Sequence, residues 1–201
     1  MFKKLASEAL GLSDIGVIVP PADYGKVDAD DYLFHEDGEK IFFLIKSKKD
    51  EYCFTNFGLI HVDGESAVSS KRSIKRYDFS TTRVSNVTIE TAGTVDRDVE
   101  LKFTLGQQVF SIDVRKNFIE QLKDIYKALI AIGRQQGYEE MARHNAGQAL
   151  GTVAGAFKIA ANDDETLVRQ FGRVLDALNE RTLIRHMTRD FGAVFQRYIQ
   201  G

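Results

Sequence analysis

The chain of 201 residues holds few side chains that commonly do covalent chemistry, namely one cysteine and four histidines. Cys53 lies between Tyr52 and Phe54 in an apolar run, which predicts a buried structural thiol and not a nucleophile. The histidines are far apart, with no second histidine four residues away: His35, His61, His144 and His186. This spacing predicts no metal site, although it leaves open one that is assembled in space.

Sequence templates for catalysis are also absent. The chain has no P-loop, no G-x-G-x-x-G after a strand and no G-x-S-x-G turn for a nucleophile. We therefore predict a non-enzymatic protein that uses no cofactor. An enzyme would need titratable groups converging in a pocket, which the linear pattern does not display.

Basic side chains gather at two places and could bind an anion. One group lies at a turn between two predicted strands, and the other puts four cations within six residues: Lys46, Lys48, Lys49, Lys71, Arg72, Lys75 and Arg76. A phosphate-bearing headgroup needs several cations that converge, preferably with arginine. An anionic lipid or phosphorylated ligand is one interpretation. Solvated charges that keep strand edges from pairing are the other, and the adjacent Asp50 and Glu51 favour it. The net charge of −2, with no aromatic residue between the cations, does not predict nucleic-acid binding.

A glycine repeat marks the carboxy-terminal third of the chain. Gly147, Gly151 and Gly155 recur every four residues and fall along one face of a helix. Each glycine costs a helix about 1 kcal/mol relative to alanine, so the repeat favours a close helix contact that offsets this cost. That contact could lie within the chain or between subunits.

The elements that must position these groups change character near residue 117. Before it, short β-type runs alternate with polar turns, and we predict seven strands at residues 40–46, 51–55, 58–63, 73–79, 84–92, 99–105 and 109–114. Short strands joined by short turns indicate an antiparallel sandwich or barrel. A short helix at residues 2–10 and another near the acidic run at 28–31 are predicted in front of them.

Helical periodicity follows the strands. Asn117 opens an amphipathic helix over residues 117–134, which we expect Gly133 or Gly137 to end. Beyond it, residues 138–161 are rich in alanine and glycine. Two further apolar stripes are expected to pack on each other or on a second subunit, and their central residues are Phe171, Val174, Leu178, Phe191 and Phe195.

Composition fits a globular protein, with 43% hydrophobic and 28% charged residues. A single cysteine excludes an internal disulfide and favours a reducing compartment. No apolar run reaches the roughly 20 residues that span a bilayer, and the first residues do not form a signal-peptide pattern. We therefore expect a cytoplasmic protein.

Seven strands followed by one amphipathic helix form the layout of a pleckstrin-homology (PH) domain. Four strings resemble the bacterial PH-domain family: DEYCFT at 50–55, IHVD at 60–63, ETAG at 90–93 followed by DRD at 96–98, and VELK at 99–102. One departure is Phe57-Gly58, where family members often carry Lys-Arg. The resemblance implies an α+β, PH-like fold of two nearly orthogonal sheets capped by a helix. It also implies assembly into rings or other homo-oligomers, without implying a known ligand.

These expectations divide the chain into a PH-like domain at residues 1–135 and a helical, hairpin-type oligomerisation extension at 138–201. We predict a binding and assembly module whose main partner is a second copy of itself, through strand edges and the helical tail. The predicted oligomer contacts are the three glycines and the five apolar residues of the tail stripes. A protein or peptide partner, and an anionic membrane lipid on the basic residues, are the alternatives.

Overall fold

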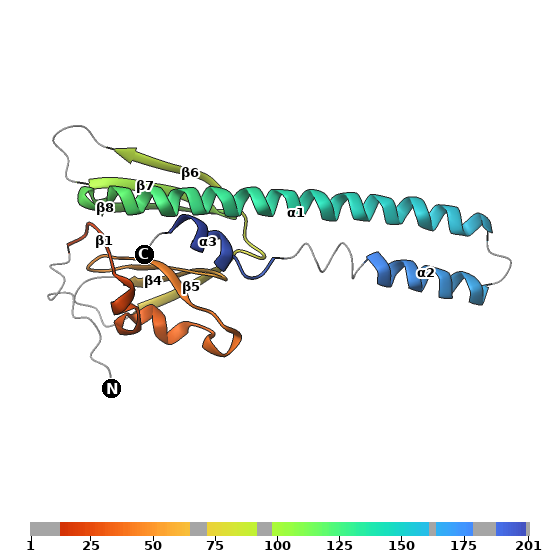
Figure 1. The fold of residues 1–201 in the computed structure, drawn as a ribbon, viewed down its shortest axis with the longest axis horizontal. Coiled ribbons are helices and arrows are strands. Elements are labelled where there is room, and N and C mark those ends of the chain that lie inside the picture. The colour runs from red at the N-terminus through yellow and green to blue at the C-terminus, as the bar shows by residue number, and fades with distance from the viewer. Residues whose placement is uncertain (1–12, 65–71, 92–97, 161–163, 179–187, 200–201) are drawn as a thin grey trace. The chain divides into compact units, whose positions relative to one another are not determined.

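The computed structural model describes residues 13–64, 72–91, 98–160, 164–178 and 188–199 (Figure 1). The chain forms two compact units, of which the first contains residues 1–133 and 189–201 and the second contains residues 134–188. The helix expected at residues 2–10 lies outside the described residues. Each unit is described by itself below.

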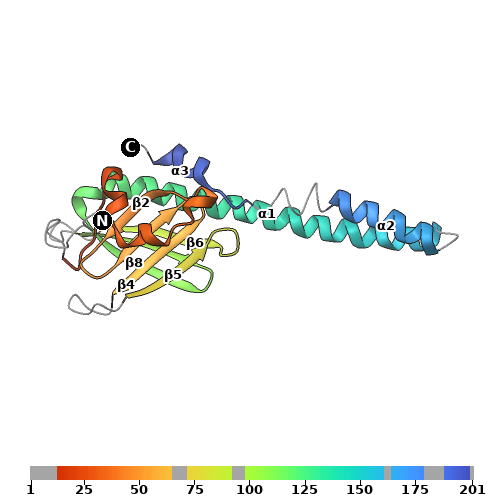
Figure 2. The ribbon, with the colours of Figure 1, turned by 90° about the horizontal axis from the view of Figure 1, so that it is seen from below.

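The first unit contains two antiparallel sheets (Figure 2). The larger sheet has the order β1-β2-β3-β4-β5, with β1 (Val17–Ile18), β2 (Ile41–Lys46), β3 (Glu51–Thr55), β4 (Gly58–Gly64) and β5 (Arg72–Asp78). The smaller sheet has the order β6-β7-β8, with β6 (Val84–Thr91), β7 (Asp98–Leu105) and β8 (Gln108–Arg115). All seven predicted strands are present, and β1 is an additional strand that the sequence did not predict.

The two sheets meet at one side of the sandwich. Gly16, just before β1, donates its N–H to the carbonyl of Asp113 and forms a bridge with Val114 of β8. Within the described residues the sheets are not otherwise joined, so the sandwich prediction is confirmed and the closed-barrel alternative is wrong. Both β5 and β6 are outer strands of their sheets.

The helix that follows the strands is much longer than predicted. After a short 3-10 turn at Lys116–Phe118, α1 extends from Ile119 to Ala160 without ending at Gly133 or Gly137. A Cβ atom placed on Gly133 would lie 2.6 Å from the carbonyl oxygen of Val84. This glycine therefore allows close packing of α1 on the start of β6, and it does not terminate the helix.

The core of the first unit lies between the sheets and beneath the first part of α1. Alternation along β7 buries Val99, Leu101, Phe103 and Leu105, because every second side chain faces the same way. Leu122, Ile125 and Leu129 of α1 pack against them at helical spacing. A smaller cluster, which includes Leu44 and Cys53, lies under the two 3-10 turns at Pro21–Lys26 and Asp28–Tyr32.

The last helix, α3 (Gly192–Tyr198), completes this core. The ring of Phe195 stacks on Phe42 at 5.3 Å between centroids, and the ring of Phe191 meets Phe79 edge-on at 5.8 Å. Both α3-segment phenylalanines are fully buried. This corrects the prediction that places Phe191 and Phe195 at an oligomer contact, because their own unit already covers them.

The second unit is a helical insertion between two parts of the first unit in the sequence, and we call it the arm. It consists of residues 134–160 of α1 and α2 (Asp164–Leu178), which lie side by side in both views (Figures 1 and 2). Its base is closed by Thr188, whose N–H and hydroxyl donate to the Glu139 carboxylate, and by Gln135, which donates to the Thr188 hydroxyl at 2.8 Å. No helix among the described residues combines the length and the hydropathy that a membrane span requires.

Candidate functional site

Lys46 does not face an anionic ligand. It is buried in the larger sheet, and its ammonium group forms an ion pair with the Glu51 carboxylate. The same carboxylate accepts hydrogen bonds from the backbone N–H groups of Asp28 and Ala29, which begin a 3-10 turn. This corrects the prediction for Lys46, because burying a charge requires a partner and Glu51 supplies it internally.

Arg76 is also occupied by acidic groups of its own unit. Its guanidinium donates two hydrogen bonds of 3.0 Å to the fully buried Glu39 carboxylate and one of 2.7 Å to Asp78. The guanidinium also lies over the ring of Phe34, 4.7 Å from its centroid. Glu39 in turn accepts from the Thr55 hydroxyl and the Phe34 N–H. Arg76 therefore ties β5 to β3 and to the segment before β2.

The other basic residues are exposed, and acidic side chains alternate with them. Lys75 pairs with Asp63 at 2.8 Å, Lys49 lies 3.6 Å from Asp14, and Arg72 lies 4.0 Å from Asp28. Lys48 is exposed, and Lys71 lies outside the described residues. Lys48, Lys49 and Arg72 thus lie at one end of the larger sheet.

An open cleft of about 470 Å³ lies in the first unit, beside the end of β5. Its lining contains two arginines, two aspartates, two phenylalanines and a serine: Phe34, Asp37, Phe57, Arg76, Asp78, Ser80 and Arg189. The two positive charges are matched by the two aspartates, and the buried Glu39 lies behind Arg76. The cleft therefore offers no excess positive charge for an anion.

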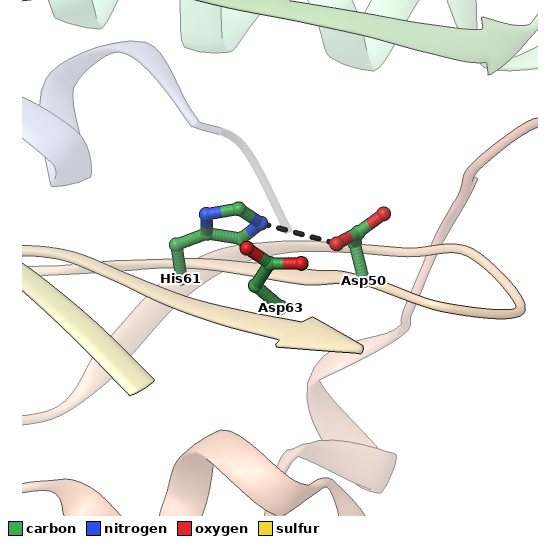
Figure 3. Close-up of side chains that lie close together, drawn as sticks. All are labelled: Asp50, His61 and Asp63. Atoms are coloured by element: carbon green, nitrogen blue, oxygen red, sulfur yellow. Dashed lines mark hydrogen bonds and ion pairs between the residues drawn. The ribbon is translucent and has the colours of Figure 1, made fainter. Parts of the chain in front are cut away.

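A cluster of metal-ligating side chains, which the sequence did not predict, lies at the other end of β4. Asp50, His61 and Asp63 each present one ligand atom within 4.8 Å of the others. Figure 3 shows the two carboxylates beside the imidazole, whose Nε2 lies 3.2 Å from Asp50 Oδ1. The His61 ring is stacked on Tyr52, with 4.5 Å between centroids and 10° between planes. We call these three residues the Asp–His–Asp cluster.

Strand register creates this cluster. His61 and Asp63 are two residues apart on β4 and therefore share a face of the sheet. Tyr52 is directly opposite His61, and Glu51 is opposite Val62, so the turn residue Asp50 comes next to Asp63. The alternation of His61 and Asp63 was a readable signal, but Asp50 joins them only once the β3–β4 register is known.

Nearby charges and burial shift the pKa values of two side chains at the cluster. The hydrogen bond from the Lys75 ammonium, together with its positive charge, holds the pKa of the Asp63 carboxyl below its ordinary value. Burial, reinforced by the negative charges of Asp50 and Asp63, raises the pKa of the Tyr52 phenol. The cluster is thus a negative site with one exposed lysine beside it.

The predicted oligomer contacts of the arm differ in how exposed they are. A Cβ atom added to Gly147, Gly151 or Gly155 would meet no atom within 4 Å, so no close contact with another described helix explains this repeat. Phe171 and Val174 are half-buried. Leu178 ends α2, and its side chain is not among those described.

The matched family model settles where the fold belongs. Residues 9–132 match the model described as bacterial PH domain. The chain belongs to the bacterial PH-domain family. The two sheets and the helix across them are therefore the PH-like fold that the local strings predicted.

Two relatives extend beyond the PH-like domain. "Uncharacterized protein YvbH" of Bacillus subtilis (strain 168) is 50% identical over 202 residues, which cover 99% of each chain. The crystal structure of a PH-domain-containing bacterial protein from Exiguobacterium sibiricum 255-15 is 42% identical with a TM-score of 0.79, and the match covers 92% of this chain and 100% of that one. The likeness therefore includes the arm and α3 as well as the PH-like domain. The name of neither relative indicates an enzyme.

This bacterial PH domain leaves two strand edges open in its described residues. Neither β5 nor β6 has a neighbour on its outer side. β5 carries Arg72, Lys75 and Arg76, and such charges discourage edge-to-edge pairing. β6 has a register shift between Ser85 and Thr88, with positive φ at Asn86, and only one charged residue, Glu90.

Proposed function

We propose that this bacterial PH-domain protein is a non-enzymatic module that assembles with copies of itself, and that the arm supplies the main contact. One observation carries the proposal. Of the side chains described in the arm, only Gln136 and Ala146 are buried. Every large apolar side chain described there is at least partly exposed, as Met141 and Val168 illustrate at 60% and 71%.

The physical argument follows from what stabilises helices in proteins. An isolated helix is marginal in water, and most helical stability comes from packing of an apolar face. Two helices side by side bury such a face only in part, so the Phe171 and Val174 stripe needs a further surface. The same stripe and the glycine repeat on another copy would provide that surface with matching chemistry.

Strand pairing is the second contact that we propose, at β6. Among the described residues no strand pairs with its outer side, and it carries fewer charges than β5. If β6 of one copy pairs with β6 of another, the contact is isologous, and if it pairs with a different strand, the contact is heterologous. Heterologous pairing closes a ring when the rotation between subunits permits it.

The decisive experiment places glutamate on the surface of each unit, at two positions in the arm of one variant and at one position in the PH-like domain of the other. Met141→Glu with Val168→Glu alters exposed side chains of the arm, and Val109→Glu alters a 65% exposed side chain on β8 of the PH-like domain. None of these positions is in the core, so each variant should fold. Light-scattering mass across a size-exclusion peak is then measured over a range of concentrations.

We expect the wild-type chain and Val109→Glu to have the same mass, above that of one chain, and the double arm variant to have a lower mass. If all three proteins have the same mass, above that of one chain, the arm contact is refuted and β6 pairing is left. Thr88→Pro in β6 would then test that pairing. A wild-type mass of one chain at every concentration would refute self-assembly. Circular dichroism of each variant separates loss of assembly from loss of folding.

A further inference from the structure

We propose that the Asp–His–Asp cluster binds a divalent transition-metal ion, with Zn²⁺ as the reference ion. Among the described residues, no other group of three histidine, cysteine or acidic side chains brings its ligand atoms this close together. The site lies entirely in the PH-like domain and does not depend on self-assembly.

The donor set decides the class of ion. An imidazole nitrogen with two carboxylate oxygens matches zinc and its neighbours, whereas Mg²⁺ and Ca²⁺ prefer oxygen donors alone. Three protein donors also match a site that keeps one position for water or another ligand. The ion would thus be held by His61 Nε2 and by one oxygen each from Asp50 and Asp63.

Distances between the donors allow this with small movements. Donors around a four-coordinate zinc ion with bonds of about 2.0–2.2 Å are about 3.3 Å apart. The Nε2–Oδ1 distance between His61 and Asp50 is already 3.2 Å, and all three donors lie within 4.8 Å. The Asp63 side chain is 36% exposed, so it has room to rotate toward the other two donors.

The histidine is the fixed member of the site. Its side chain is only 12% exposed, and its ring is held between the stacked Tyr52 and the edge contact with Phe110 at 6.0 Å. A ring that is held in this way loses little freedom when it takes up a ligand, as positioned metal ligands require. The carboxylates come from the turn between β2 and β3 and from the last residue but one of β4.

Lys75 is the competing cation. Its ammonium lies 2.8 Å from Asp63 Oδ2, but the pair is exposed, with 47% of the lysine side chain accessible. Exposed ion pairs of this kind are weak, so displacing the lysine should cost the metal no more than about fivefold in affinity. Removing the Lys75 charge should therefore strengthen metal binding.

The test titrates Zn²⁺ into the full-length, chelator-treated protein by calorimetry, and repeats the titration with Co²⁺ while recording its visible absorption. The site variants are His61→Gln and Asp63→Asn, which keep the size of each side chain. His35→Gln is the matched control, because His35 also faces an aspartate, Asp30 at 3.4 Å, and the described residues add no third ligand there. Lys75→Gln tests the opposite direction.

We expect one Zn²⁺ per chain, weakened at least about tenfold by either site variant and unchanged by His35→Gln. Lys75→Gln should tighten binding by up to about fivefold, which a variant that merely damages the fold would not do. Co²⁺ absorption should disappear with His61→Gln. Equal Zn²⁺ binding by wild type and both site variants, or Mg²⁺ binding as tight as Zn²⁺, would overturn the proposal.

Discussion

Replacing the three arm glycines by alanine tests whether their open face is an interface. In the isolated chain, a Cβ atom at Gly147, Gly151 or Gly155 meets nothing within 4 Å, so no steric cost opposes the change. Alanine is favoured over glycine in a helix interior by about 1 kcal/mol at each position. The triple variant should therefore stabilise the dissociated chain by about 3 kcal/mol.

If the chain self-assembles through the same face, the triple variant should destabilise the assembly although it stabilises the dissociated chain. Glycines at a helix contact allow the backbones to approach closely, and three added methyl groups would hold the helices apart. We expect the triple variant to raise the dissociation constant of the assembly at least about tenfold, which corresponds to about 1.4 kcal/mol. One substitution set thus separates stability of the chain from stability of the assembly.

Two measurements read these effects separately. Urea unfolding followed by circular dichroism, at a concentration where the protein is dissociated, reports the stability of the chain. Light-scattering mass over a concentration series reports the assembly. Gly172→Ala on α2 is the control, since its added Cβ also meets nothing within 4 Å but the residue is outside the repeat. A triple variant that gains stability while its mass at every concentration equals that of wild type would refute an interface at the repeat.

Three further predictions concern the PH-like domain. Phe195→Ala should lower the free energy of unfolding by about 3–5 kcal/mol in urea melts, because a fully buried ring is lost. Glu39→Gln should cost about 3 kcal/mol in the same assay, because the Arg76 guanidinium loses its buried counter-charge and keeps only Asp78. Cys53 should react with a thiol reagent only as fast as the domain opens, because burial raises the pKa of its thiol. The neutral thiol is then favoured in the folded state, so its contribution to stability should fall as pH rises above the ordinary thiol pKa of about 8.5.

Local signals were sufficient to predict the strands. Alternation marks β7 and β8, β-branched and aromatic residues mark other runs such as β2, and polar or glycine-containing turns separate them. Each of the seven runs therefore begins and ends within about two residues of the observed strand. β1 escaped prediction because Val17–Ile18 is two residues long and is recognisable only through its pairing with β2. Its position depends on a partner far along the chain.

The helical part shows where local signals mislead. Glycine weakens a helix by only about 1 kcal/mol, and packing can outweigh that cost, so Gly133 and Gly137 did not end α1. The last apolar stripe of the sequence was predicted correctly, but the surface against which it packs could not be predicted. Phe191 and Phe195 pack in the core of the first unit. Their ring partners there, Phe79 and Phe42, lie more than one hundred positions earlier in the sequence.

Charge was the least predictable property. Seven basic residues in two groups resembled an anion site in the sequence, yet four of them have an acidic partner from a distant segment, namely Lys49, Arg72, Lys75 and Arg76. Glu39 reaches Arg76 across 37 positions, and Asp63 reaches Lys75 across 12. The sequence shows how many charges there are, whereas strand register determines which of them are free.

The return of the chain to the PH-like domain determines how assembly must be tested. Removing everything after residue 134 would delete the arm together with α3, and the loss of Phe191 and Phe195 would open the core. A lower mass of this truncated chain could then result from unfolding as well as from dissociation. The arm leaves and re-enters the domain where Gln135 and Thr188 are hydrogen-bonded at 2.8 Å. Because those two residues are adjacent in space, substitutions beyond them, or an internal deletion that joins them, alter the arm and keep α3 attached to its core.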